Sequence, residues 1–138
     1  MQDVRVLALG VLNDGHIATP STAYDTGWYK DSAKPGKQGA MFIYGHVAGR
    51  GGGGIFYNLH KLKAGDKITV TRGDNQIYTY QVVSSKTYPV SHVDMDKVLS
   101  PIDSKVPGLN LMTCTWDVVN GKSEFNNRVV VFASLVAD

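Results

Sequence analysis

The segment from Leu109 to Ala133, LNLMTCTWDVVNGKSEFNNRVVVFA, decides the predicted fold of this chain. Its first six residues end at Cys114 and nearly alternate between apolar and polar, as a half-buried strand does. Its last six residues begin at Arg128 and are almost continuously apolar, which is typical of a fully buried strand. Thr115 to Asn127 contains Asn-Gly and Asn-Asn pairs, so we expect a loop there. The sequence therefore predicts two strands whose ends carry Cys114 and Arg128.

These two strand ends carry groups whose chemistry is complementary. If the strands are neighbours, the Cys114 thiol and the Arg128 guanidinium face each other at the mouth of the loop. A permanent positive charge favours the thiolate over the thiol and can also stabilise a developing oxyanion. A third strand-like run, Ala40 to Gly45, is followed by His46 and a glycine-rich loop. A nucleophile, a proton carrier and an electrostatic stabiliser are the components of a cysteine acyl-transfer site.

The residues alone also fit a non-enzymatic protein. A cysteine is often only a small buried hydrophobic residue, in which case Cys114 is inert and the chain is a β-barrel binding module. The two interpretations differ in whether the folded protein reacts with a thiol-directed reagent.

The residues around the predicted site resemble the sortases, the cysteine transpeptidases that attach proteins to the surface of Gram-positive cells. Gly27-Trp28-Tyr29 with Pro35-Gly36 is most similar to class E or class F members. Asn110 stands in the first position of the family's usual Thr-Leu-x-Thr-Cys motif, a difference expected to alter a neighbouring hydrogen bond and to leave the nucleophile untouched. The resemblance covers nearly the whole chain and is carried by Asp25 to Tyr29, Pro35-Gly36, Gly45-His46, Phe56 to Leu59, Leu62 to Asp66, Leu111 to Cys114 and Asn127 to Val131.

The resemblance implies a mechanism with named residues. Cys114 attacks the carbonyl between Thr and Gly of a Leu-Pro-x-Thr-Gly-like sorting signal and forms a thioester. His46 protonates the departing amine and deprotonates the incoming one. Arg128 and the backbone N–H of Thr115 stabilise the oxyanion, and Thr113 helps to orient the substrate. A hydrolase would use the same residues and pass the acyl group to water, and nothing in the residues separates these two acceptors.

The resemblance also implies partners and a location. The donors are surface proteins that bear sorting signals, and the acceptor is an amine such as a peptidoglycan cross-bridge or a pilin lysine. The expected location is the extracellular face of the cell membrane. Sortases normally carry an N-terminal membrane anchor, whereas the early apolar run of this chain, Val6 to Leu12, is too short to span a bilayer. The resemblance therefore implies an excised catalytic domain with an artificial start at Met1.

The stretch from Pro89 to Pro107 has little strand character, and Ser91 can cap a short helix that runs through Leu99. By resemblance this stretch receives the Leu-Pro part of the sorting signal. His92 also lies here and is a weaker candidate than His46 for the catalytic histidine, because no apolar strand precedes it. The candidate pocket residues are Val90, Val93, Met95, Val98 and Ile102.

Length and composition set the remaining limits. At 138 residues the chain is long enough for one domain, which we expect to span 1–138. One cysteine permits no internal disulfide, and a net charge of +2 without a basic run makes nucleic acid an unexpected partner. The histidines and the cysteine show no close-paired ligand spacing, so we expect no metal and no cofactor. Asp94, Asp96 and Asp103 lack the pattern of a calcium loop.

The predicted fold is all-β, a closed sortase-like barrel of about eight strands with one or two short helices. Asp14-Gly15 and Gly73-Asp74-Asn75 are hairpin turns, and Thr19 to Gly39 is irregular. The glycine-rich segment Arg50 to Gly54 is a flap beside His46, since it lacks the Lys-Ser/Thr that a phosphate-binding loop needs. Besides the two strands already described, we expect strands at 4–12, 16–18, 40–45, 67–72 and 76–83, and a short helix at 56–62.

Overall fold

The structure is a computed structural model that describes residues 6–9, 26–29, 32–45, 48–49, 52–53, 56, 59–71, 75–89, 93–119 and 122–136. For 6–9, 26, 48–49, 52–53, 60, 114–119 and 122–126 it describes the backbone alone. The elements in chain order are β1 (Val6–Leu9), β2 (Thr26–Tyr29), β3 (Ala40–Gly45), β4 (Ala48–Gly49), β5 (Gly52–Gly53), the 3-10 helix η1 (Leu59–Lys61), β6 (Lys67–Thr71), β7 (Ile77–Pro89), α1 (Met95–Val98), β8 (Gly108–Val119) and β9 (Lys122–Leu135).

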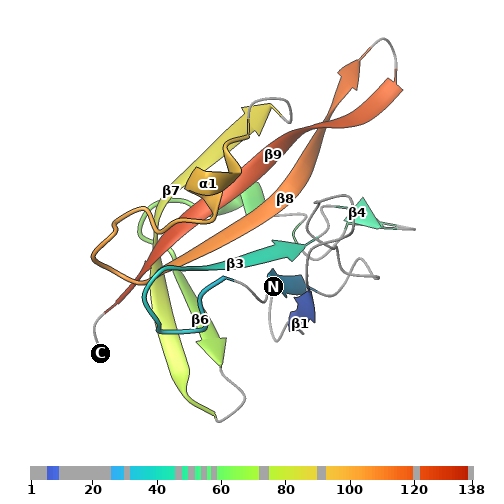
Figure 1. Cartoon of the computed structure of the whole chain (residues 1–138). Helices are drawn as coiled ribbons and strands as arrows, with labels where there is room; N and C mark the ends of the chain where they lie inside the picture. The colour runs from blue at the N-terminus through green and yellow to red at the C-terminus, as the bar shows by residue number, and fades with distance from the viewer. Residues whose placement is uncertain are drawn as a thin grey trace.

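Seven of these strands form one sheet in the order β1-β2-β3-β8-β9-β7-β6, and β4 pairs with β5 separately. The pairs β1–β2 and β3–β8 are parallel, and the other neighbours in the sheet are antiparallel. Figure 1 shows β7, β8 and β9 as long, strongly twisted strands, with β3 beside β8. The predicted all-β fold with few and short helices is confirmed, and the described ladders join the seven strands in an order that has β1 and β6 at its two ends.

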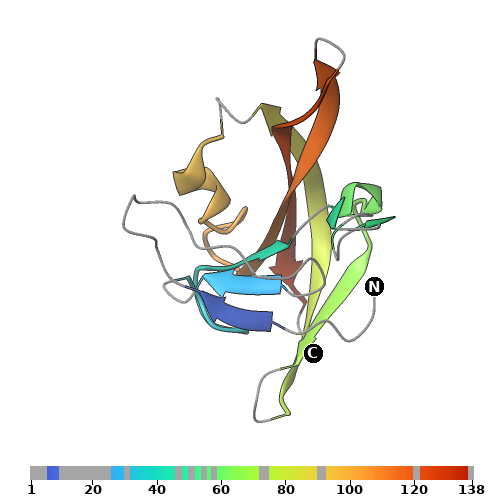
Figure 2. The ribbon, with the colours of Figure 1, turned by 90° about the vertical axis from the view of Figure 1, so that its right-hand side faces the viewer.

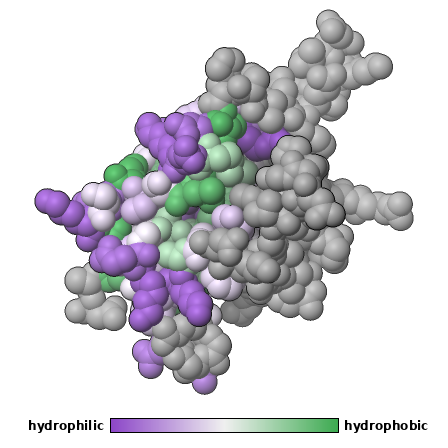
Figure 3. Space-filling model, in the orientation of Figure 1, coloured by the Kyte–Doolittle hydropathy of each residue, from purple (hydrophilic) through white to green (hydrophobic). Residues whose placement is uncertain are grey.

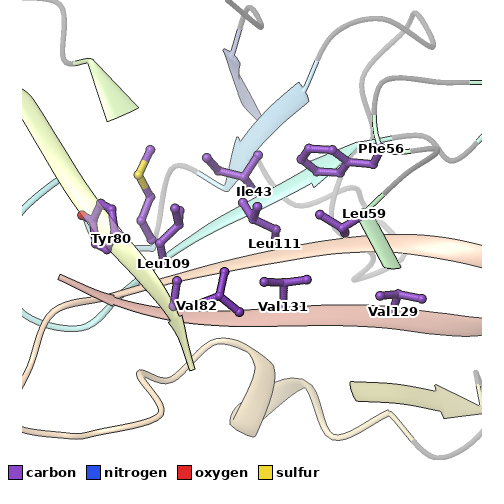
Figure 4. Packing of buried hydrophobic residues seen from close by; sticks show 11 residues of the cluster. Ile43, Phe56, Leu59, Tyr80, Val82, Leu109, Leu111, Val129 and Val131 are labelled. Carbon is purple, nitrogen blue, oxygen red and sulfur yellow. The ribbon is translucent and has the colours of Figure 1, made fainter. Parts of the chain in front are cut away.

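Both faces of the central strands are covered, because successive side chains of a strand point to opposite faces. Figure 2 shows η1 and α1 on opposite sides of the sheet. One apolar cluster, the η1-side cluster, includes Leu59 of η1 with Leu109 and Leu111 of β8 and Val129 and Val131 of β9 (Figure 4). The other, the α1-side cluster, consists of Phe42, Val98, Met112, Val130 and Phe132.

The β8–β9 hairpin is longer than the sequence predicted. The expected loop from Thr115 to Asn127 is wrong, because β8 continues to Val119 and β9 begins at Lys122. Cys114 and Arg128 therefore lie within their strands and not at the strand ends. The cause is cross-strand pairing that continues to Val119 and Lys122, with the favoured hairpin pair Asn-Gly between them. Only a register shift between Thr115 and Asp117 interrupts this ladder.

Other elements differ from prediction for related reasons. β2 lies in the segment predicted to be irregular, because Thr26–Tyr29 pairs with strands on both sides. β7 extends to Pro89, six residues past the predicted end at Val83, because it pairs with β9 along this length. The N-cap of α1 is Asp94 and not Ser91, and of the predicted 56–62 helix the structure describes the turn Leu59–Lys61. The predicted strand at 16–18 lies outside the described residues.

A tight turn before β3 is fixed by a tyrosine of β7. The N–H of Gly36 donates a hydrogen bond of 2.9 Å to the Tyr80 hydroxyl. Gly36 has a φ of 76°, and a Cβ there would overlap the ring of Tyr78. Burial raises the pKa of the Tyr80 phenol above its ordinary value, against the opposing effect of the hydrogen bond from Gly36. The hydrogen bond from Gly36 to Tyr80 joins the turn to the sheet, although the two residues are 44 positions apart in the sequence.

Candidate active site

Cys114 and Arg128 are direct cross-strand partners in the β8–β9 ladder. On its other side, Arg128 is the partner of Tyr88 on β7. Residues opposite each other in an antiparallel pair have Cβ atoms about 4.5 to 5.5 Å apart and share one face of the sheet. The prediction that the two strands are neighbours with Cys114 opposite Arg128 is therefore confirmed, and the catalytic roles of both residues stay predictions.

This row of positions belongs to the face that α1 covers. Met112 lies in the α1-side cluster, and position 114 is two residues further along the same strand. Val130 lies in the same cluster, and position 128 is two residues before it on β9. Because alternate residues of a strand share a face, positions 114 and 128 fall on the α1 side of the sheet.

The guanidinium of Arg128 is partly buried and held near its own strand. Its Nη1 donates a hydrogen bond of 3.1 Å to the carbonyl oxygen of Asn127. The guanidinium offers five donors in a rigid fork, and this bond uses one of them. The arrangement suits a cation that stays close to the backbone at position 114.

The histidine of the predicted triad lies outside the described residues. β3 ends at Gly45, immediately before His46. The β3–β8 ladder is parallel and runs from the pair Ala40 and Gly108 to the pair Tyr44 and Met112. The alternative histidine, His92, is also outside the described residues, so the choice between the two stays a prediction.

The two threonines beside Cys114 differ in what the structure describes. Thr113 is 1% exposed, and its hydroxyl is buried without a hydrogen-bond partner. It is opposite Val129, a member of the η1-side cluster, so alternation assigns it to the face away from position 114. For Thr115 the backbone pairs with Asn127 and the side chain is outside the description. Their predicted roles in orienting the substrate and binding the oxyanion are not tested by this geometry.

Three of the five predicted pocket residues lie together. Val98 is buried in the α1-side cluster, and Val93 and Met95 pack against it. Ile102 is 40% exposed, and Val90 is outside the described residues. Figure 3 shows hydrophobic side chains gathered among hydrophilic ones on this face of the molecule. Four residues outside the predicted pocket set also pack on this cluster: Tyr29, Tyr44, Tyr88 and Leu99. Alternation from Phe42 would have indicated Tyr44.

The α1 segment is capped at one end and tied to the sheet at the other. The Asp94 carboxylate accepts hydrogen bonds from the N–H groups of Asp96 and Lys97. The Asn110 side chain on β8 donates to the carbonyl oxygens of Val98 and Ser100, at 2.6 and 2.8 Å. Asn110 is fully buried. It stands at the motif position where this chain differs from the sortase pattern, and its side chain contacts the predicted pocket segment through these two hydrogen bonds.

The acidic side chains near α1 have structural partners. Asp94 caps the helix, and Asp103 accepts a hydrogen bond from the N–H of Lys105. In the part of the chain that the structure describes, no three His, Cys, Asp or Glu side chains are grouped as a metal ion would need. Among the same residues, no helix has both the length and the apolar character to cross a membrane.

Comparison with known proteins shows one family. The model of the sortase domain family matches residues 3–136. A sortase D transpeptidase of Clostridium perfringens is 23% identical, with a TM-score of 0.66 over 96% of this chain and 70% of its own. The SrtA sortase of Actinomyces oris is 21% identical, with a TM-score of 0.70 over 97% and 71%. Sortase C of Clostridium perfringens is 18% identical, with a TM-score of 0.67 over 98% and 63%. No curated protein matches the sequence.

Proposed function

This chain belongs to the sortase family of cysteine transpeptidases, and on that premise we propose that Cys114, His46 and Arg128 form its catalytic site. Cys114 is the nucleophile, His46 carries protons, and Arg128 stabilises the oxyanion. The observation that carries the proposal is the direct pairing of Cys114 with Arg128 in the β8–β9 ladder.

The assignment of His46 draws support from the neighbouring ladder. Tyr44 on β3 pairs with Met112 on β8. If this register continued for two more residues, position 46 would be level with position 114. His46, Cys114 and Arg128 would then form one row across β3, β8 and β9. The continuation is part of the proposal, since β3 is described only to Gly45.

The proposed reaction has two acyl transfers. With the thiol proton on His46, the Cys114 thiolate attacks the carbonyl carbon between Thr and Gly of the sorting signal, and the carbonyl oxygen becomes an oxyanion. Arg128 and the N–H of Thr115 stabilise that charge. As the C–N bond breaks, His46 gives a proton to the leaving amine, and the acyl group remains on sulfur as a thioester. An incoming amine loses a proton to His46, attacks the thioester and releases Cys114.

The substrate is proposed to be a Leu-Pro-x-Thr-Gly-like sorting signal. The described part of the surface proposed to bind this signal is apolar. Val93 and Met95 pack against the α1-side cluster, on the face of the sheet that also carries positions 114 and 128. An apolar surface of this kind suits the Leu-Pro part of the signal. Val90 and Ile102 complete the proposed pocket. Thr113 is proposed to affect substrate orientation only through the strand that carries Cys114, because its own side chain is buried on the other face of the sheet.

The proposed donors are surface proteins that bear such signals, and the proposed acceptor is an amine of the cell wall or of a pilin. The corresponding site of action is the outer face of the Gram-positive cell membrane. The three sortases compared above are named as members of classes A, C and D. Membership of class E or F stays a prediction for this chain.

Product analysis with and without an added amine tests the transfer step. The protein is incubated with a fluorescent sorting-signal peptide alone, and then with a glycine-type or a lysine-type amine. We expect faster product formation with an amine and a ligated product that contains it. If the amine never enters the product at any concentration, the protein is a hydrolase of the same signal and the proposed transfer is wrong.

A further inference from the structure

Asn110 joins the α1 segment to the strand that carries the nucleophile. Its side-chain amide donates to the carbonyl oxygens of Val98 and Ser100. Val98 is the last residue of α1, and Asn110 is near the start of β8. One side chain therefore holds the C-terminal end of α1 against the sheet.

The other described hydrogen bonds between Asp94 and Val106 stay within this segment, and the next bond to the sheet runs from the N–H of Leu135 on β9 to the carbonyl oxygen of Pro107. Within the described residues 94–106, they join parts of the segment to each other, as in Leu99 to Met95, the Ser100 hydroxyl to Asp96, and Val106 to Asp103. The apolar contact of Val98 with the α1-side cluster supplies attraction without direction. The amide of Asn110 is thus the directional link between α1 and β8 in this part of the chain.

β8 carries both Asn110 and Cys114, so it relates the position of the α1 segment to the position of the proposed nucleophile. Asn110, Met112 and Cys114 alternate along β8, so all three positions share one face. A strand rises about 3.3 Å per residue, which sets Asn110 and Cys114 about 13 Å apart along β8. A pocket wall fixed to Asn110 is therefore fixed relative to the nucleophile.

The amide is used only as a donor. Its Oδ1 is buried and has no hydrogen-bond partner among the residues that the structure describes. A buried acceptor without a partner costs stability, so the two hydrogen bonds that the amide donates come with a cost at Oδ1. A single hydroxyl, as in Thr, has one donor and can satisfy only one of the two carbonyls.

We propose that Asn110 is a positioning residue that sets where the α1 segment stands relative to Cys114, and thereby sets the affinity and selectivity for the apolar part of the sorting signal. The proposal rests on the proposed function, because it takes the α1 segment as the wall of the peptide site. Asn110 itself contacts neither the substrate nor the reacting atoms.

The test compares Asn110→Ala, which loses both bonds, with Asn110→Thr, which can keep one. Ser100→Ala is the matched control, because it loses the 2.6 Å bond from the Ser100 hydroxyl to Asp96 in the same segment and leaves the Asn110 link intact. Three quantities are measured: KM and kcat for sorting-signal peptides, the rate of Cys114 alkylation by a small reagent, and hydrogen exchange in a peptide spanning Lys97 to Ser100.

For Asn110→Ala we expect KM to rise about tenfold to thirtyfold, the range that corresponds to the loss of two hydrogen bonds. Preference for Leu-Pro over Ala-Pro peptides should fall by a similar factor. The value of kcat and the alkylation rate should stay within about threefold, because the proposed catalytic groups keep their places. Exchange at Lys97 to Ser100 should accelerate, Asn110→Thr should be intermediate, and Ser100→Ala should match the parent.

The proposal is overturned if KM and selectivity are unchanged in Asn110→Ala, even when hydrogen exchange at Lys97 to Ser100 accelerates. If Asn110→Ala fails to fold, Asn110→Thr decides, and a parent-like KM in that variant overturns the proposal as well. A parent that forms no acyl product from any such peptide would overturn the proposed function instead. Hydrogen exchange would still show in that case whether Asn110 holds the segment.

Discussion

Positions 114 and 128 are cross-strand partners on neighbouring strands, and the role proposed for Arg128 is to stabilise the oxyanion that forms when Cys114 attacks. Lys in place of Arg128 would keep the charge and lose the planar fork of donors. Removing one oxyanion donor costs about a hundredfold to a thousandfold in turnover, or about 2.7 to 4 kcal/mol. We expect Arg128→Ala to lose at least that much kcat and Arg128→Lys to lose most of it.

The kinetics should be accompanied by a thermal melt of each variant. Arg128 is only partly buried, so we expect both variants to fold. An Arg128→Lys enzyme within about threefold of the parent would show that the fork is not needed. Unfolding of either variant would make the residue structural.

Tyr80 links stability to alkaline pH. Burial raises the pKa of its phenol, so between the unfolded value near 10 and the folded value the unfolded chain loses its proton first. The stabilisation that Tyr80 provides is therefore complete below about pH 10 and declines as the pH rises through the folded pKa.

Tyr80→Phe isolates this effect. At neutral pH it should destabilise the protein by about 1 to 3 kcal/mol, because the N–H of Gly36 loses its partner. Urea unfolding of parent and variant at about pH 8 and about pH 11 measures the difference at each pH, and that difference should shrink at the higher value. A difference that stays constant or grows would contradict the raised pKa.

At the scale of elements, the turn that leads into β3 depends on two tyrosines of β7. Gly36 and Gly65 both have positive φ, at 76° and 99°, but only Gly36 lacks room for a Cβ, which would overlap the Tyr78 ring. Left-handed backbone costs about 1 to 2 kcal/mol with a side chain, so both Gly→Ala changes should destabilise. The added overlap should make Gly36→Ala worse by at least about 1 kcal/mol.

Equilibrium unfolding of the two Gly→Ala variants checks this difference. Equal losses would mean that the Tyr78 ring moves aside without cost, and that the turn is held less firmly than the contact between Gly36 and Tyr80 indicates.

The central hairpin shows which parts of the elements were readable from the sequence. The apolar runs that end at Cys114 and begin at Arg128 were identified, because alternation and burial leave a local pattern. Their extension to Val119 and from Lys122 was not, since the residues between have the local composition of a loop. β2 was missed for the same reason: strand pairing on both sides, which no local pattern records, fixes Thr26–Tyr29.

At the scale of the whole molecule, the sheet is covered on both faces, and this decides how the site is built. The η1-side cluster holds β8 and β9 together from one face, and the α1-side cluster and the α1 segment cover the other. The family resemblance predicted that the 89–107 stretch lies at the site. The sequence did not show that Asn110 ties that stretch to β8, because a long-range side-chain contact has no signature in local spacing.

The pairing of Cys114 with Arg128 followed from treating the two runs as neighbours, and the ladder confirms it. His46 lies outside the described residues, and β3 is described to Gly45, immediately before it. The proposed role of His46 depends on continuing the register of β3. The proposed role of Cys114 can be tested more directly, by a measurement that detects the covalent acyl intermediate.

Intact mass spectrometry after incubation with a Leu-Pro-x-Thr-Gly-like peptide, without added amine, tests the central claim that Cys114 accepts the acyl group. We predict a mass increase equal to the peptide up to its Thr, located on Cys114 by fragmentation, absent from Cys114→Ala and removed by hydroxylamine as the hydroxamate. Peptide cleavage by Cys114→Ala at the parent's rate, or an adduct on any other residue, would contradict the account.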